Sequence, residues 1–315
     1  MSHIKNTVSL LARLALASVA MSIAYILSTL IISQTGTPLT PEEASWAGKA
    51  LFLVSTINAL VLAYPILRSD WHGLKLIGVV FIIQFGVETF MTQIETLYFN
   101  RSLQVKAHEM MELIASGALR ALIFAPLAVL FLGKLKNSGQ PGDSRAALKL
   151  SEWGWRFAAL AMLYPIIYFM FGYYVAWQWE ETRLFYSGTT VILPFLTHFR
   201  GFFSSDPYII PFQIMRGVLW AALAMLIVNM MKAKRWESAL AVALIFAGIL
   251  SSGIGLFPNP YMPPMVRQSH FYELLSSMLL FGGIAGWILY GKNQKIVQKQ
   301  NVKTTPKPNI RVEAR

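Results

Sequence analysis

Polar and ionisable side chains recur at helical spacing inside the apolar segments of this chain. Four of them are separated by four, four and three residues and so share one helical face: Gln84, Glu88, Thr92 and Glu95. The next apolar segment carries a similar series, Glu109, Glu112, Ser116 and Arg120. Two later segments carry Gln213 with Arg216, and Arg267, His270, Glu273 and Ser277. Because ionisable groups inside a membrane are costly, these faces are the first candidates for function.

Two histidines and two carboxylates form a candidate metal-binding set. Imidazole and carboxylate groups are ligands that zinc and iron accept. The run from His108 to Glu112 lacks the second histidine of the zincin motif, so the pattern matches no known signature. A divalent metal is the one cofactor that the sequence suggests, with four candidate ligands: His108, Glu112, His270 and Glu273.

The composition indicates a membrane protein and excludes several enzyme classes. Of the 315 residues, 55% are hydrophobic and 13% are charged, against about a quarter charged in soluble domains. The chain has no cysteine, which excludes disulfides, thiolate metal ligands and a cysteine nucleophile. No glycine-rich phosphate-binding loop is present, so this chain alone is not expected to use ATP.

Hydropathy predicts an all-α polytopic bundle, because a membrane-crossing helix needs about 20 mostly apolar residues. Eight transmembrane helices are expected within a domain covering residues 1–291, at 8–33, 47–67, 74–99, 110–133, 155–178, 209–231, 238–257 and 270–290.

The distribution of Lys and Arg predicts the orientation. The two termini and the loops on their side hold nineteen of these residues, and the opposite side holds six. Positively charged loops are retained in the cytoplasm, so both termini are expected there. We expect an integral protein of a bacterial inner (plasma) membrane. The net charge of +12 then indicates membrane lipids as partners, not nucleic acid.

Orientation also places the polar faces at one depth. The segment 74–99 runs outward and the other three polar segments run inward, so their polar residues lie in the outer half of the membrane. This predicts a polar cavity open to the non-cytoplasmic side. Its candidate substrate-binding residues are Glu88, Glu95, Arg120, Arg216 and Arg267. Alternatively, these residues form structural ion pairs between helices or reach the outer headgroups.

One contact can be predicted from depth. Glu88 lies eleven residues from the outer end of its helix and Arg120 ten residues from the outer end of the next. At a rise of 1.5 Å per residue, these depths are about 16 and 15 Å. We therefore predict an ion pair or a water-linked contact between Glu88 and Arg120 at the floor of the cavity.

Other segments suggest internal organisation and contacts. The openings of the fourth and eighth helices resemble each other, which suggests two four-helix halves, 1–140 and 141–291. The aromatic loop 178–212 suits the membrane interface and could form a lid. Residues 292–315 form a basic cytoplasmic tail that we expect to be disordered. Gly282 and Gly286 form a Gly-x-x-x-Gly face for a neighbouring helix, internal or in a second subunit such as a homo-oligomer partner.

The function expected from these patterns is binding or transport of a polar or amphiphilic solute through an outward-facing cavity. The arginines suggest that the solute carries an anionic group. Two alternatives remain open: an intramembrane enzyme that acts on a lipid or lipid-linked substrate with the His and Glu cluster, and a non-catalytic membrane scaffold.

Overall fold

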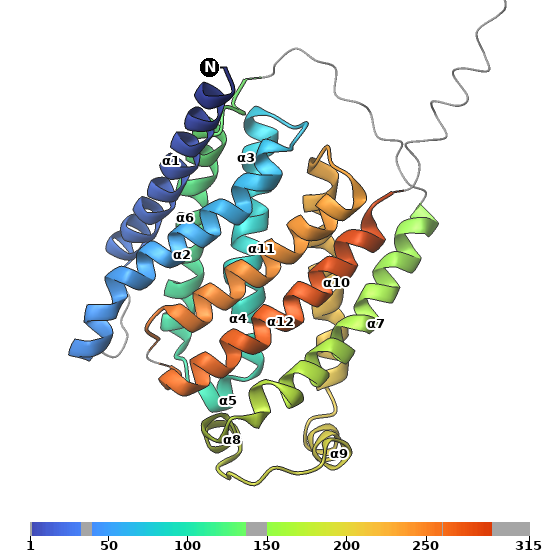
Figure 1. Cartoon of the computed structure of the whole chain (residues 1–315). Helices are drawn as coiled ribbons and strands as arrows, with labels where there is room; N and C mark the ends of the chain where they lie inside the picture. Colours follow the sequence, from blue (N-terminus) through green and yellow to red (C-terminus); the bar gives the residue numbers. More distant parts are fainter. Residues whose placement is uncertain (1, 33–39, 137–149, 260, 292–315) are drawn as a thin grey trace, which may run out of the picture.

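The computed structural model describes residues 2–32, 40–136, 150–259 and 261–291 as an all-α bundle without strands (Figure 1). Within these residues, eight helices are long and apolar enough to cross a membrane, which confirms the predicted fold class. The spans are α1 (Ser2–Ile31), α2 (Pro41–Leu67), α3 (Gly73–Phe85) with η1 (Gly86–Phe90) and α4 (Met91–Tyr98), α6 (Ala107–Phe131), α7 (Leu150–Tyr174), α10 (Ile209–Met230), α11 (Arg235–Leu256) and α12 (Pro264–Leu289). The predicted tail lies outside the described residues, and the two four-helix halves stay a prediction.

Short helices gather at one end of the bundle, which we call the capped end. They are α5 (Asn100–Leu103), the 3-10 turn η2 (Ala176–Gln178), α8 (Glu180–Ser187) and α9 (Phe195–Ser205). The start of α1 and the end of α12 both lie at the opposite end, which we call the basic end (Figure 1). An even number of spans produces this arrangement.

The last span begins earlier than hydropathy predicts. Pro264 occupies the first position of α12, where its missing N–H and fixed φ angle are tolerated. The helix therefore starts six residues before the predicted start at His270 and also contains Arg267. Both side chains are thus held on a regular helix at the capped end.

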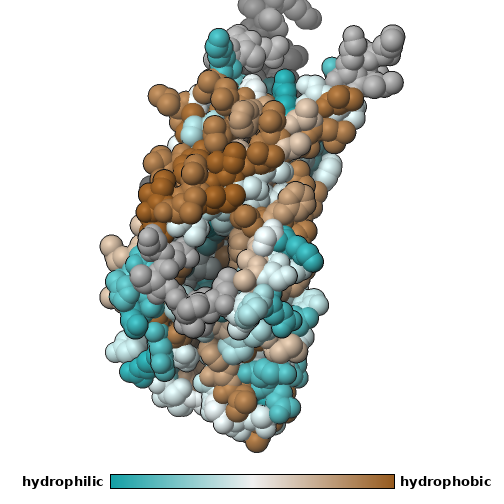
Figure 2. All heavy atoms as spheres, turned by 90° about the vertical axis from the view of Figure 1, so that its left-hand side faces the viewer, coloured by the Kyte–Doolittle hydropathy of each residue, from teal (hydrophilic) through white to brown (hydrophobic). Residues whose placement is uncertain are grey.

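The first span shows how the bundle faces lipid. Ala17, Ala20 and Ala24 on α1 are buried against the neighbouring helices, as small residues allow close packing in membranes. The large apolar side chains of the same helix point outward, including Leu11 (61% exposed) and Leu30 (73% exposed). Figure 2 shows apolar atoms gathered over part of this side of the molecule.

The Gly-x-x-x-Gly face of α12 is covered inside the chain. A Cβ atom at Gly282 would lie 2.8 Å from the Cα atom of Ala243, and one at Gly286 would lie 2.7 Å from the Cα atom of Ala239. Only glycine permits this approach of two backbones. The neighbour of this face is therefore α11, and the close contact is internal.

Backbone hydrogen bonds join three loops at the basic end. Ser69 and Met231 form an antiparallel bridge, flanked by bonds from Asp70 N to Met230 O (3.1 Å) and from Lys232 N to Arg68 O (2.7 Å). The loop after α6 adds a bond from Gly73 N to Lys134 O (3.0 Å), and Lys134 Nζ donates to Ser69 O (2.8 Å). We call this group of contacts the loop clasp.

Candidate functional site

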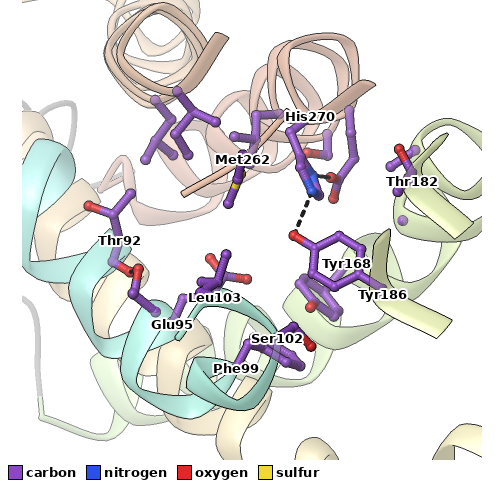
Figure 3. A pocket seen from close by; sticks show the side chains of 18 of the residues that line it. Thr92, Glu95, Phe99, Ser102, Leu103, Tyr168, Thr182, Tyr186, Met262 and His270 are labelled. Carbon is purple, nitrogen blue, oxygen red and sulfur yellow. Dashed lines mark hydrogen bonds and ion pairs between the residues drawn. The ribbon is translucent and has the colours of Figure 1, made fainter. Parts of the chain in front are cut away.

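A cavity of about 1060 Å³ lies in the half of the bundle nearer the capped end. Its walls come from seven of the eight spans and from α8 and α9. Figure 3 shows Thr92 and Glu95 on one side of this space, and His270 and Tyr186 across from them. The volume is at the upper end of the range for small-molecule sites, roughly 300–1,000 Å³.

The predicted ion pair of Glu88 and Arg120 is confirmed at the deep end of the cavity. Arg120 Nη1 donates to Glu88 Oε1, and both side chains are mostly buried. Tyr25 on α1 completes the group, because its hydroxyl donates to the same oxygen at 2.5 Å. The Arg120 guanidinium also lies 3.9 Å from the centre of the Tyr25 ring. Oε1 of the carboxylate thus receives two hydrogen bonds, Oε2 accepts a third from Gln84 Nε2 at 3.4 Å, and the guanidinium gains a cation–π contact.

Hydrogen bonds extend this group to two further helices. Asn58 on α2 donates to the Tyr25 hydroxyl at 3.0 Å, and Ser252 on α11 donates to Asn58 Oδ1 at 3.1 Å. Asn58 and Ser252 are fully or almost fully buried. Five helical segments therefore meet in one polar network at the centre of the membrane domain.

Glu88 lies within η1, a π-helical turn between α3 and α4. A π-turn places one extra residue in the helix and is frequent at functional sites. One extra residue rotates everything after it by about 100° relative to a regular α-helix. Glu88 and Glu95 therefore meet different helices, although their spacing predicts a single face.

Glu95 pairs with Arg216 of α10 in a second buried contact. Arg216 Nη2 donates to Glu95 Oε2 at 2.5 Å, and Nη1 donates to Gln213 Oε1 at 3.0 Å. The guanidinium also lies 5.5 Å and 5.9 Å from the ring centres of Tyr164 and Tyr168. Arg216 is 3% exposed, so its charge is balanced by Glu95 inside the protein.

A third polar group lies at the start of α12. His270 Nδ1 is 2.8 Å from Glu273 Oε2, and its Nε2 is 3.0 Å from the Tyr186 hydroxyl. Burial raises the pKa of Tyr186, as do the charges of Glu95 and Glu273. The hydroxyl therefore stays protonated and donates to Nε2, while Nδ1–H donates to the carboxylate. This arrangement orients the imidazole beside the cavity.

The loop 178–212 covers the cavity from the capped end. α8 and α9 both contribute lining residues, including Tyr186, Phe199 and Phe202. α9 rests on α7 through ring contacts such as Phe169 with Phe199, whose centres are 5.1 Å apart. The ring of His198 lies 4.7 Å from that of Trp177, and burial lowers the pKa of His198.

The structure gathers most of the predicted binding residues. Glu88, Glu95, Arg120 and Arg216 line the cavity, and their role in binding stays a prediction. Arg267 is buried and lies outside the lining. Its guanidinium forms an ion pair with Glu43 of α2 at 3.4 Å and donates to the Asn259 carbonyl at 3.1 Å.

The predicted metal ligands do not form one group. Glu112, His270 and Glu273 line the cavity, whereas His108 is not among its lining residues. In the described parts of the chain, no three histidine, aspartate or glutamate side chains are placed to hold a metal ion. The two ring nitrogens of His270 are already engaged by Glu273 and Tyr186.

Sequence reasoning missed the tyrosines. Tyr25 bonds Glu88, Tyr186 bonds His270, and Tyr164 and Tyr168 flank Arg216. Tyrosine is common near membrane interfaces and did not stand out by type alone. Tyr25 lies deep in an apolar helix, where its hydroxyl must find a partner, and that was the available signal.

The eight spans and their polar cavity define the chain as an integral, polytopic helical membrane protein. Comparisons with models of protein families, with curated proteins and with solved structures find no match for this chain.

Proposed function

We propose that this protein binds a polar or amphiphilic solute in its cavity and transfers it across the membrane. The capped end faces the non-cytoplasmic side and the basic end faces the cytoplasm of a bacterial inner membrane, in agreement with the excess of Lys and Arg on the side of the termini. The solute enters from the capped end.

The extent of the cavity is the observation that carries this proposal. The lining runs from α8 and α9 down to the Glu88–Arg120 pair and includes no residue of the loop clasp. The lining combines two buried ion pairs with apolar side chains and aromatic rings. A chamber of this size between several helices, with a few polar groups in a largely apolar lining, is the form expected of a transporter that opens to one side.

Thiol accessibility tests the chamber directly, because the native chain has no cysteine and an introduced one is the sole thiol. Thr92→Cys places a thiol in the cavity wall (Figure 3). Leu122→Cys on α6 places the matched control on the outer surface, where Leu122 is 61% exposed among apolar neighbours. The reagent is a charged, membrane-impermeant maleimide added to oriented vesicles.

The cavity thiol should react from the side of the capped end, and the lipid-facing thiol should not, because a charged reagent does not enter hydrocarbon. Added solute that occupies the cavity should slow the first reaction. If Thr92→Cys resists labelling from both sides as Leu122→Cys does, no solute can reach the cavity and the proposal fails.

The Tyr186–His270–Glu273 group favours a second candidate function, an intramembrane hydrolase. Once a water molecule displaces the Tyr186 hydroxyl from Nε2, His270, oriented by Glu273, could remove a proton from that water as it attacks an ester and then return the proton to the leaving alcohol. Hydrolysis of a short-chain p-nitrophenyl ester by the purified protein would test this. His270→Asn should abolish the rate and His72→Asn, at the start of α3 at the basic end, should not; equal rates in both variants would exclude the candidate.

A further inference from the structure

Within the proposed function, we infer that the solute is an amphiphilic organic cation, a molecule with an ammonium-like head and an apolar body. This inference rests on the proposed binding role of the cavity. It differs from the anionic group that the arginines suggested in the sequence. Three properties of the lining carry it: the balance of charges, the state of the arginines and the abundance of aromatic faces.

The charged groups of the lining are mainly acidic. Among the described residues, the cavity is lined by five glutamates and two arginines. With the histidines neutral, the formal balance of the lining is five negative charges against two positive ones. Lys106, just outside the lining, pairs with Glu109 at 3.8 Å and reduces the excess to two negative charges. Low-dielectric walls focus such a field, so a cation is drawn in and an anion is repelled.

The acidic groups are also spread along the entry path. Glu109 and Glu112 lie in the first turns of α6 at the capped end, Glu95 and Glu273 lie further in, and Glu88 lies at the floor. A cation moving inward would therefore pass carboxylates near the entrance and further in, although Glu88 and Glu95 are paired with arginines and Glu109 with Lys106. No lysine is among the described lining residues.

The two arginines are already engaged within the protein. Arg216 directs Nη2 to Glu95 and Nη1 to Gln213, while its Nε atom is buried without a hydrogen-bond partner. Arg120 directs Nη1 to Glu88, and its Nε atom is likewise buried without a partner. An anion would have to compete with a buried carboxylate for either guanidinium, which disfavours anion binding at these positions.

Aromatic rings supply the remaining wall. Fourteen of the described lining residues are Phe, Tyr or Trp, and the negative faces of such rings bind organic cations. The protein itself shows that they do so here: the Arg120 guanidinium lies over the Tyr25 ring, and that of Arg216 lies near Tyr164 and Tyr168. Tyr168 and Tyr186 both project into the space seen in Figure 3. The same rings hold the apolar body of an amphiphile.

A pair of probes with opposite charge tests the inference. Benzyltrimethylammonium and benzylsulfonate share a benzyl body and carry tetrahedral heads of opposite sign. Binding of each is measured by isothermal titration calorimetry to the full-length protein in phosphatidylcholine nanodiscs, with empty nanodiscs as the blank. The cation should bind about tenfold or more tightly than the anion, because the net negative charge of the lining acts at close range in a poorly screened site.

Two sets of variants locate the binding. Glu112→Gln removes one half-buried charge of the lining and should weaken the cation about threefold to tenfold without weakening the anion. Tyr168→Leu should weaken the cation more than Tyr168→Phe does, because phenylalanine keeps the ring face. The comparison of Tyr168→Leu with Tyr168→Phe tests cation binding even where Glu112→Gln does not fold.

The outcomes separate the inference from the proposed function. Tighter binding of benzylsulfonate would overturn the cationic assignment and would leave a solute-binding cavity in place. Absence of saturable binding by benzyltrimethylammonium would also overturn the assignment, and thiol labelling of Thr92→Cys would then show whether the cavity admits solutes. Preference for the cation that depends on Glu112 and on the Tyr168 ring supports the inference.

Discussion

The buried contact between Glu88 and Arg120 lends itself to a double-mutant cycle. Their side chains are 8% and 13% exposed, so removal of one charge leaves the other buried without its charged partner. Glu88→Gln or Arg120→Gln alone should lower the free energy of unfolding by about 3–5 kcal/mol. The double variant leaves two neutral amides and should cost only about 1–3 kcal/mol. The two single losses should therefore exceed the double loss by at least about 3 kcal/mol.

Equilibrium unfolding in mixed micelles, driven by increasing dodecyl sulfate and followed by circular dichroism, measures these losses. The chain contains its own control in the pair of Arg68 and Glu237 at the basic end, which are 2.6 Å apart with Arg68 50% exposed. The same cycle on this pair should give a coupling energy of about 0.2–1 kcal/mol, because exposed ion pairs contribute little.

A coupling energy below about 1 kcal/mol for Glu88 and Arg120 would refute the reasoning. It would mean that water reaches the pair freely or that the two groups do not meet in the membrane. Equal coupling in the buried and exposed pairs would lead to the same conclusion.

Three further predictions follow from the packing and the hydrogen bonds. Gly282→Ala should destabilise the protein by about 1–3 kcal/mol, because its Cβ would meet the Ala243 backbone. The control Gly283→Ala has room for a Cβ and should not destabilise it. Chemical unfolding compares the two variants, and equal effects would contradict the α11–α12 contact. Tyr25→Phe should cost about 1.5–3 kcal/mol in the same assay since it removes the hydroxyl between Glu88 and Asn58, and an unchanged stability would show that this bond is weak. Burial among aromatic rings lowers the pKa of His198, and Tyr173 is the titratable group that faces it. The packed state of α9 should therefore lose stability as the pH falls below about 6.5, because the imidazole gains a proton more readily when α9 is detached. Proteolysis of the α8–α9 loop should accelerate from about pH 8 to about pH 5 in the wild type but not in His198→Gln, and a parallel acceleration in both would contradict this role.

The sequence predicts the eight spans well because each needs only local hydrophobicity and length. It also predicts the Glu88–Arg120 contact, because a charged residue inside a membrane needs a partner of opposite charge at the same depth. The position of Arg216 against Glu95 could not be foreseen, because it depends on which helices are neighbours. Spacing alone does not hold that information.

Local backbone geometry limits the prediction in a second way. The rule that residues three or four apart share a face assumes a regular α-helix, and η1 breaks that assumption between Glu88 and Glu95. The four predicted metal ligands are not brought into one group among the described residues, for a related reason. His108 and His270 have suitable types, yet their neighbours in space are set by packing, and His270 is directed to Tyr186 and Glu273.

The loop clasp bears on how often the membrane domain could open at the basic end. If the protein transfers solute as proposed, a path through the loop clasp requires four hydrogen bonds to open: Asp70 to Met230, Lys232 to Arg68, Gly73 to Lys134, and Lys134 to Ser69. At a net value of about 0.5–1.5 kcal/mol for each of four bonds, that opening costs roughly 2–6 kcal/mol. A form open at the basic end would then be populated to a few per cent at most. The empty protein would therefore leak very little, and a bound solute must favour the second form by a comparable free energy to be released there.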